Sequence, residues 1–337
     1  MNIFLFEYAV SSGDKEINDN IFEEGYLMYK TLLNDFINNN HTVYTIISEN
    51  NYNKIVNNLK NVNLNISNID NLKITILKNN ENYNLKIEEL LKNNKNINCG
   101  LIIAPECDNI LYNLTKTLEK YNILNLGCFS EGIKIAGDKY LTYLKIKNVV
   151  NTPKTIKPNN YIVKDICGCG GEHEIINNNK IIQEYIKGEN YSFSFIVSNT
   201  NNKIYPLCLN KQYINKCYCG GETNINHNLK EKIIIQCKKA LKEINGLNGY
   251  VGVDIIITEN NEIYILEINP RITTSVVGIN TTPSLGSLLI DNIVNDNNKN
   301  NKNNKNNKNN KNKNNDLKYT INKGIKFRRN NGSFEFF

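Results

Sequence analysis

Short apolar runs alternate with amphipathic stretches over the first third of the chain. Four runs have the length and composition of β-strands: Ile3 to Tyr8, Thr42 to Ile47, Lys73 to Leu77 and Gly100 to Ala104. After the first run, apolar side chains recur at helical spacing: Ile21, Met28, Leu32, Leu33 and Phe36. Asp108 is placed to cap a helix that runs to Tyr121. This alternation predicts a parallel α/β layer in this part of the chain.

The pattern changes after Gly127. Two short helices are predicted over Ser130 to Ala136 and Asp138 to Lys147, with Asp138 as an N-cap. Further strands are predicted over Tyr161 to Ile166, Ile181 to Ile186 and Tyr191 to Val197, and further helices over Lys230 to Ile244 and Ser284 to Val294. The chain therefore divides near this glycine.

The stretch from Gly249 to Arg271 carries the most informative pattern. Its two apolar runs, Tyr250 to Thr258 and Glu262 to Ile268, flank a short polar turn, which predicts a β-hairpin. The side chains expected to pack this hairpin are Ile265, Leu266 and Ile268.

Three polar residues interrupt the hairpin. Because strand side chains alternate between faces, Glu267 and Asn269 project to one side, and Asp254 on the partner strand can face them. Three oxygen donors on one face suit a hard cation such as Mg²⁺ or Mn²⁺. A solvated polar face is the ordinary alternative, but a bare carboxylate at Asp254 would be costly inside an apolar run.

The charge of the chain is concentrated near its end. The formal net charge is +7, yet residues 295–337 carry 11 basic and 3 acidic residues, while the remainder carries 29 and 30. A near-neutral body argues against nucleic-acid binding. Asn295 to Asn315 is almost purely Asn and Lys and is expected to be disordered. Lys318 to Phe337 regains apolar residues and is expected to dock back as a strand.

Export and membrane insertion are not expected. No apolar run reaches the ~20 residues that span a bilayer. The start, MNIFLFEYAV, lacks a basic region and contains Glu7, so it indicates a first strand rather than a signal peptide. We expect a cytoplasmic protein whose nine cysteines are reduced. The pairs Cys167/Cys169 and Cys217/Cys219 have too short a spacing to favour structural zinc.

Several motifs suit a nucleotide. Lys164 ends a strand and is followed by Gly168, Gly170 and Gly171, a combination that can place an ammonium and backbone N–H groups around phosphates. A glycine turn between hairpin strands is the alternative. Lys139 is a second candidate cation, and a solvated helix lysine would look the same. The extended run Gln183, Glu184, Tyr185 and Ile186, followed by Glu189, can read adenine and ribose, or form an edge strand and a turn.

Arginine is informative because it is rare. The chain contains Arg271, Arg328 and Arg329, so one arginine lies in the body, directly after the metal-type motif. Bidentate binding of a carboxylate or phosphoryl group would require a guanidinium there; a structural salt bridge is the alternative.

Together these motifs resemble the ATP-grasp superfamily. They occur in its order and approximate spacing: Asp138-Lys139, Lys164 with its glycine loop, Gln183 to Ile186, Asp254, and Glu267-Ile-Asn-Pro-Arg271. The resemblance covers roughly residues 128 to 294. The segments FEYAVSSG, IAPECDNILYNLTK, GCFSEGIKIAGDKYLTYLKIK and NGLNGYVGVDIII narrow it to the ligases of archaeal methanofuran biosynthesis that join L-glutamate to tyramine.

The resemblance implies an α/β fold with ATP between the last two of three structural units. Its expected divisions are an N-terminal α/β domain at 1–127, a lid at 128–190, a larger antiparallel-sheet subdomain at 191–294, a linker at 295–315 and a tail at 316–337. Lys139 and Lys164 would hold phosphates. Asp254, Glu267 and Asn269 would bind two divalent cations.

The implied reaction is acyl-phosphate formation from a carboxylate and ATP, followed by attack of an amine. Arg271 would clamp the acyl phosphate or substrate carboxylate, and Lys211 would add a cation near the γ-phosphate. Ribose would contact Glu189 or Asn190. A ligase for another amino acid and amine, an ATP-grasp kinase and a non-catalytic ATP-binding protein remain open, as does the oligomeric state, a homodimer included.

Overall fold

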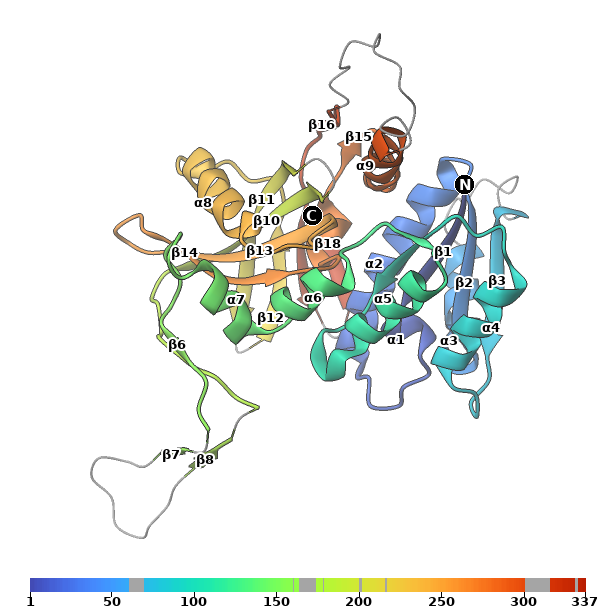
Figure 1. Ribbon diagram of the computed structural model, residues 1–337, viewed down its shortest axis with the longest axis horizontal. Coiled ribbons are helices and arrows are strands. Elements are labelled where there is room, and N and C mark those ends of the chain that lie inside the picture. The colour runs from blue at the N-terminus through green and yellow to red at the C-terminus, as the bar shows by residue number, and fades with distance from the viewer. Residues whose placement is uncertain are drawn as a thin grey trace.

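The computed structural model describes residues 1–60, 70–159, 161–163, 174–177, 179–199, 202–215, 217–300, 316–330 and 333–337. Two sheets form the body of the molecule, each in its own half of the ribbon (Figure 1). The first is parallel and belongs to the N-terminal part of the chain; the second is antiparallel and mostly C-terminal. This agrees with the predicted fold class.

The N-terminal sheet has the strand order β3-β2-β1-β4-β5, and its pairs are parallel. Its strands are β1 (Asn2–Glu7), β2 (Thr42–Ser48), β3 (Leu72–Leu77), β4 (Cys99–Ile103) and β5 (Leu124–Asn125). The helices of this half are α1 (Tyr8–Ser11), α2 (Asp19–Asn38), α3 (Glu49–Lys60), α4 (Tyr83–Asn93) and α5 (Ile110–Lys120), with a 3₁₀ turn η2 (Cys107–Asn109). All four strands predicted here are confirmed.

Alternation along β1 divides the core. Ile3 and Leu5 pack with α2, whereas Phe4 and Phe6 pack with α4 and α5. The sheet is therefore covered by helices on both faces, as expected for parallel strands. The predicted Asp108 cap is wrong: Asp108 has a φ of 51° inside η2, and α5 begins after Asn109 without a side-chain cap.

The second sheet has the order β14-β13-β10-β11-β12-β17-β18. Its strands are β10 (Glu189–Ser198), β11 (Lys203–Asn215), β12 (Cys217–Glu222), β13 (Gly249–Ile257), β14 (Ile263–Asn269), β17 (Lys326–Asn330) and β18 (Ser333–Phe336). Helices α6 (Ser130–Ala136), α7 (Lys139–Ile146) and α8 (Lys230–Lys242) contribute to the hydrophobic core on one face.

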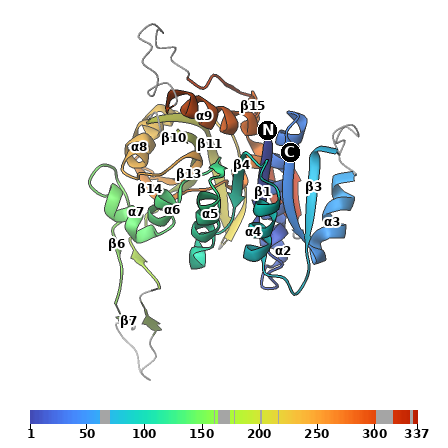
Figure 2. The ribbon, with the colours of Figure 1, turned by 45° about the vertical axis from the view of Figure 1, so that its right-hand side comes forward.

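Two small antiparallel pairs extend from this body. They are β6 (Thr155–Ile156) with β9 (Ile182–Gln183), and β7 (Tyr161–Val163) with β8 (Glu174–Ile176). Both ribbon views show β7 projecting away from the two sheets (Figures 1 and 2). The lid expected from the resemblance, residues 128–190, includes these two pairs.

Helix α9 (Leu285–Asn300) lies between the two halves (Figure 2). Its Gly286 N–H donates to Asp35 on α2 at 3.0 Å, and Asn292 donates to the Val197 carbonyl of β10 at 3.0 Å. The helix continues to Asn300, six positions beyond its predicted end at Val294, so residues 295–300 are helical where disorder was expected. Residues 301–315 lie outside the described part.

The C-terminal segment is part of the second sheet. After β15 (Thr281–Thr282) pairs with β16 (Thr320–Ile321), β17 pairs with β12 and β18 closes the edge. The prediction that the end docks back as a strand is confirmed. In the part of the chain that the structure describes, no helix is both long and apolar enough to cross a membrane.

Candidate active site

The β13–β14 hairpin presents its polar residues to one face through an irregular register. Asp254 pairs with Glu267 and Gly252 with Asn269, but Ile255 pairs with Ile265, so Leu266 is an extra residue in β14. The bulge turns Ile265 into the core, where it is fully buried, while Glu267 and Asn269 line a cavity. Simple alternation would place Ile265 on the same face as Glu267. Leu266, expected to pack the hairpin, lines the cavity instead.

Asp254 and Glu267 form a half-buried carboxyl pair. Burial, followed by the negative charge of Glu267, raises the pKa of Asp254 from its ordinary 3.8 to about 7. Asp254 accepts hydrogen bonds from Gln212 at 3.1 Å and Asn269 at 3.2 Å. Burial also acts to raise the pKa of Glu267, but the charge and hydrogen bond of Lys139 outweigh it and hold the pKa below its ordinary value.

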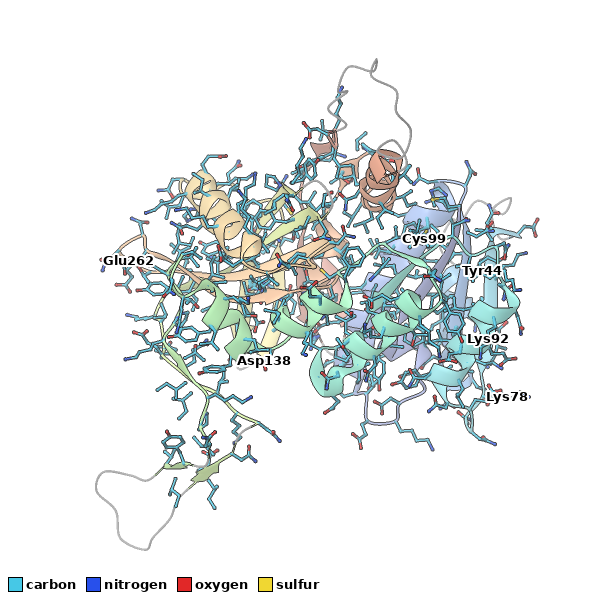
Figure 3. All side chains as sticks on the ribbon, viewed as in Figure 1. Tyr44, Lys78, Lys92, Cys99, Asp138 and Glu262 are labelled. Carbon is cyan, nitrogen blue, oxygen red and sulfur yellow. The ribbon has the colours of Figure 1, made fainter. Side chains whose placement is uncertain are left out.

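Lys139 reaches this pair from the start of α7. Asp138 caps the helix by accepting from the N–H groups of Tyr140 and Leu141 at 2.8 and 3.0 Å, as predicted. The capped turn fixes the position of Lys139, whose ammonium contacts the Glu267 carboxylate. Figure 3 shows Asp138 beneath the second sheet and Glu262 at the distant tip of the β13–β14 hairpin.

A cavity of about 400 Å³, here called the site cavity, lies over this face of the sheet. It collects polar residues from several elements: Lys139, Gln183, Asn190, Ser192, Gln212, Asp254, Glu267, Asn269 and Arg271. The structure thus brings the predicted metal ligands, Lys139 and Arg271 together with Gln183 of the predicted adenine strand.

The donor set fits a hard divalent cation. Two adjacent carboxylates and the Asn269 carboxamide offer oxygen ligands of the kind that Mg²⁺ and Mn²⁺ prefer. Burial and the neighbouring Glu267 charge disfavour the ionised form of Asp254, as its raised pKa shows, and a cation would offset that cost. Among the described residues, no three His, Cys, Asp or Glu side chains gather into a metal-type group; Asn269 supplies the third ligand type.

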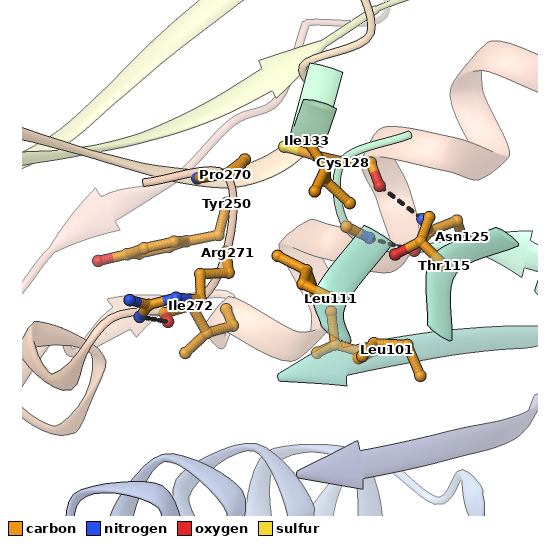
Figure 4. Close-up of a pocket in the computed structure, with 12 residues that line it drawn as sticks. Leu101, Leu111, Thr115, Asn125, Cys128, Ile133, Tyr250, Pro270, Arg271 and Ile272 are labelled. Atoms are coloured by element: carbon orange, nitrogen blue, oxygen red, sulfur yellow. Dashed lines mark hydrogen bonds between the residues drawn. The ribbon is translucent and has the colours of Figure 1, made fainter. Parts of the chain in front are cut away.

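Arg271 lies where the two halves meet. Its Nε is 2.9 Å from the Glu106 carboxylate, and its Nη1 donates to the Ile272 carbonyl at 3.2 Å. In Figure 4 Arg271 and Tyr250 lie opposite Leu101 and Leu111 of the N-terminal half, around a gap of about 10 Å³. That gap is no larger than the ~10–15 Å³ a single water needs, so substrates must lie in the larger cavities.

Glu7 is a buried carboxyl group for which the sequence predicted only a place in the first strand. It caps α1 by accepting from the Val10 N–H at 2.8 Å. Gly25 of α2 approaches it so closely that a Cβ there would lie 2.5 Å from Oε1. Burial raises the pKa of Glu7 from 4.5 to about 7, against the opposing effects of backbone hydrogen bonds and Arg271.

This shift predicts a pH-dependent stability. The folded protein binds the Glu7 proton more tightly than the unfolded chain, so the stabilisation is complete below pH ~4.5 and is lost as pH rises to about 7. The loss is on the order of 3 kcal/mol. Glu7→Gln keeps the group neutral, so its free energy of unfolding relative to wild type should rise by this amount between pH 4 and pH 8, measured by denaturant titration. If the free energy of unfolding changed with pH equally in Glu7→Gln and in the exposed control Glu231→Gln, the assignment would be contradicted.

The predicted strand over Ile181 to Ile186 is shorter in the structure, where β9 covers Ile182–Gln183, and its adenine-reading residues lie only partly at the cavity. Gln183 lines it and donates to Thr155 at 3.0 Å, while Glu184 pairs through its backbone N–H with Lys154 at 2.8 Å. Tyr185 is 88% exposed, and Ile186 is half-buried. Of the two candidates for ribose, Asn190 lines the cavity, whereas Glu189 contacts Tyr191 and Lys211.

Lys211 points away from the carboxyl pair. Neighbouring Gln212 donates to Asp254, and adjacent strand residues face opposite sides of a sheet. Lys211 instead lies 2.9 Å from Glu189. Its catalytic role stays a prediction. Lys164, Gly168, Gly170 and Gly171 lie outside the described residues.

Sequence reasoning missed the partners that orient the named residues. Gln212 donates to Asp254, and Glu106 pairs with Arg271. Glu24, which belongs to none of the predicted motifs, also lines the site cavity. Asn210 and Gln212 are two residues apart in the Leu-Asn-Lys-Gln segment and therefore lie on the same face of β11, where Asn210 pairs with Ser192. This alternation of polar residues was the sequence signal for Gln212.

Comparisons with known proteins agree with this geometry. The family model for the ATP-grasp domain matches residues 136–275, and that for the pre ATP-grasp 3 domain matches residues 67–133. Tyramine–L-glutamate ligase of Methanocaldococcus fervens is 48% identical over 295 residues, covering 87% of this chain and 94% of the relative. The ligase of the same name from Methanocaldococcus jannaschii is 49% identical, covering 87% and 90%.

Solved structures show the same architecture. An ATP-grasp superfamily protein from Archaeoglobus fulgidus superposes with a TM-score of 0.64 at 29% identity, covering 86% of this chain and 88% of that one. An L-amino acid ligase from Bacillus licheniformis gives a TM-score of 0.54 at 12% identity, covering 86% and 73%, and so supports the fold alone.

Proposed function

This chain belongs to the ATP-grasp family and, within it, to the tyramine–L-glutamate ligases, and on that premise we propose that its active site is the site cavity. The chain is an ATP-dependent ligase that joins the γ-carboxylate of L-glutamate to the amine of tyramine. The observation that supports this site is the convergence of Lys139, Asp254, Glu267, Asn269 and Arg271 on one cavity.

We assign the metal and nucleotide roles from that convergence. Asp254, Glu267 and Asn269 would hold two divalent cations, whose chemistry is to neutralise phosphate charge. Lys139 would bind phosphates, Gln183 would lie at the adenine end, and Asn190 would contact ribose. The sequence resemblance adds Lys164 as a second phosphate-binding lysine. When ATP binds, Lys139 would exchange its contact with Glu267 for a phosphate.

The first chemical step forms an acyl phosphate. A γ-carboxylate oxygen of glutamate attacks the γ-phosphorus of ATP, the bond from that phosphorus to the β–γ bridging oxygen breaks, and ADP leaves. Arg271 orients the carboxylate through its guanidinium, which Glu106 holds in place at Nε. Lys139 stabilises charge on the transferring phosphoryl group.

The second step forms the amide. The neutral nitrogen of tyramine attacks the acyl carbon, the carbon–oxygen bond to phosphate breaks, and the nitrogen loses one proton, which leaves with the inorganic phosphate. A lid formed by the chain around β6 to β9 would exclude water, which would otherwise hydrolyse the acyl phosphate.

The proposal extends to the setting of the enzyme. From the sequence resemblance we place the reaction in methanofuran biosynthesis in the cytoplasm of a methanogenic archaeon. We keep the division into 1–127, 128–190, 191–294, 295–315 and 316–337, with a homodimer as the assembly to test by light scattering.

The test is a product analysis. Purified protein is incubated with ATP, Mg²⁺ or Mn²⁺, L-glutamate and tyramine, and the products are separated and fragmented by mass spectrometry. We expect γ-glutamyltyramine, ADP and phosphate in equal amounts. ADP formation without an amide, across a panel of amines, would contradict the ligase assignment; ADP release that needs no amine and leaves a stable phosphorylated product would identify a kinase.

A further inference from the structure

A second cavity, here called the acidic cavity, lies at the carboxyl ends of β1 and β4 and has a volume of about 370 Å³. The strand order β3-β2-β1-β4-β5 shows that the chain leaves β1 towards one edge and returns to add β4 on the other side. Open α/β sheets bind ligands at this type of switch point. The position of the acidic cavity therefore suits a ligand.

The acidic cavity adjoins the site cavity. Arg271 and Glu24 line both of them. Glu7 and Arg271 both line the acidic cavity. A molecule in the acidic cavity can therefore present one end to a group that Arg271 holds.

The lining of the acidic cavity combines an apolar wall with carboxylates. The apolar residues come from the loop before α2, from α2 and from the end of β4: Ile17, Ile21, Met28, Ile103 and Ala104. The carboxyl groups are Glu7, Asp14, Glu16, Glu24 and Asp108, of which Glu24 is already paired with Arg329. Among the described residues that line it, Arg271 is the sole base, and Glu106 already pairs with it. This surface attracts a cation with an apolar body and repels an anion such as glutamate.

A third cavity, about 590 Å³ in volume, supplies the contrast. Its lining includes Lys134, Lys139, Lys157 and Lys180 together with Glu106, Asp108 and Asp138. It lacks the excess of carboxylates, so an ammonium gains less there. The acidic cavity and the third cavity therefore differ in the charge of their lining.

We propose that the acidic cavity is the amine subsite: the arene of an arylethylamine lies against Ile21 and Met28, and the nitrogen end points past Glu7 and Glu24 towards Arg271. The carboxylates gather the cationic form of the acceptor, which loses one proton to solvent before it attacks, and the apolar wall selects its ring. This inference rests on the proposed ligase function and names the part of the chain that chooses the amine.

The first test fills the apolar wall. Ile21 is 54% exposed, so Ile21→Trp should leave folding intact while occupying the space of the ring. We expect kcat/KM for tyramine to fall about tenfold relative to kcat/KM for ethylamine, a size of effect usual for steric discrimination. Ile235→Trp is the matched control, because Ile235 is 55% exposed on α8 outside the cavity. An unchanged tyramine-to-ethylamine ratio in Ile21→Trp would overturn the proposal.

The second test reverses one charge. Glu16→Lys should raise KM for tyramine several-fold, with a smaller effect at high salt, and leave KM for glutamate unchanged. Glu231→Lys, on α8, makes the same charge change away from the cavity. Equal effects of the two variants, or a parallel change in KM for glutamate, would also overturn the proposal.

Hydroxylamine separates this inference from the proposed function. It intercepts an acyl phosphate as a hydroxamate without needing the apolar wall. Ile21→Trp and Glu16→Lys should form γ-glutamyl hydroxamate at the wild-type rate. Absence of hydroxamate from the wild type would instead contradict the ligase proposal, whereas normal hydroxamate with unaltered amine preference would overturn the amine subsite alone.

Discussion

Glu267→Gln should reduce amide formation at least ~10³-fold, because a charged oxygen donor is lost where phosphoryl transfer depends on electrostatic stabilisation. Glu267 faces Asp254 across β13 and β14 and contacts Lys139. A glutamine keeps the shape but neither ligates a cation with a charged oxygen nor pairs with the lysine. The measurement is steady-state formation of γ-glutamyltyramine, accompanied by titration of Mn²⁺ binding.

The matched control for this variant is Glu262→Gln. Glu262 is exposed at the tip of the same hairpin (Figure 3), so its replacement should keep full turnover and the same Mn²⁺ affinity. Circular dichroism should show both variants folded. Near-wild-type turnover of Glu267→Gln would remove the metal assignment from the hairpin.

The hairpin also shows what periodicity can and cannot predict. The apolar runs, the polar turn and the placement of Asp254 beside Glu267 follow from strand alternation and were predicted. The bulge at Leu266 was not, because an extra residue in one strand leaves no mark in a pattern of apolar and polar positions. A register error of one residue moves a side chain to the other face.

Residues whose role depends on distant neighbours were harder to find. Glu7 lies in a predicted strand, but its burial comes from the close approach of Gly25 on α2, and its charge environment comes from Arg271 near the other end of the chain. Lys211 looked suited to a phosphate, yet its strand position turns it towards Glu189. The burial of Glu7 and the direction of the Lys211 side chain both depend on tertiary contacts, which the local sequence does not reveal.

The C-terminal tail gives the second large expected effect. It is net basic and lies beyond the residues that the ATP-grasp model matches. In the structure Phe327 of β17 is 1% exposed and pairs with Gly221 of β12. Arg329 forms an ion pair with Glu24, which lines both the site cavity and the acidic cavity. The tail therefore supports a wall of the site.

Phe327→Ala should lower the free energy of unfolding by about 3–5 kcal/mol, the usual cost of removing a fully buried aromatic ring. The ring contacts Phe334 and Phe336, with centroid distances of 5.7 and 6.1 Å, so its loss also loosens β18. Denaturant titration measures the change, and turnover should fall at temperatures where the wild type is stable.

Phe337→Ala is the control within the same tail. Phe337 is 71% exposed, and its replacement should change stability by no more than ~0.5 kcal/mol, as for most surface substitutions. If the tail acts only through charge and solubility, the two alanine variants will behave alike, since neither alters a charge. A large loss confined to Phe327→Ala would instead show that the last strands belong to the folded body, and that a truncation before residue 316 removes part of the sheet supporting Glu24.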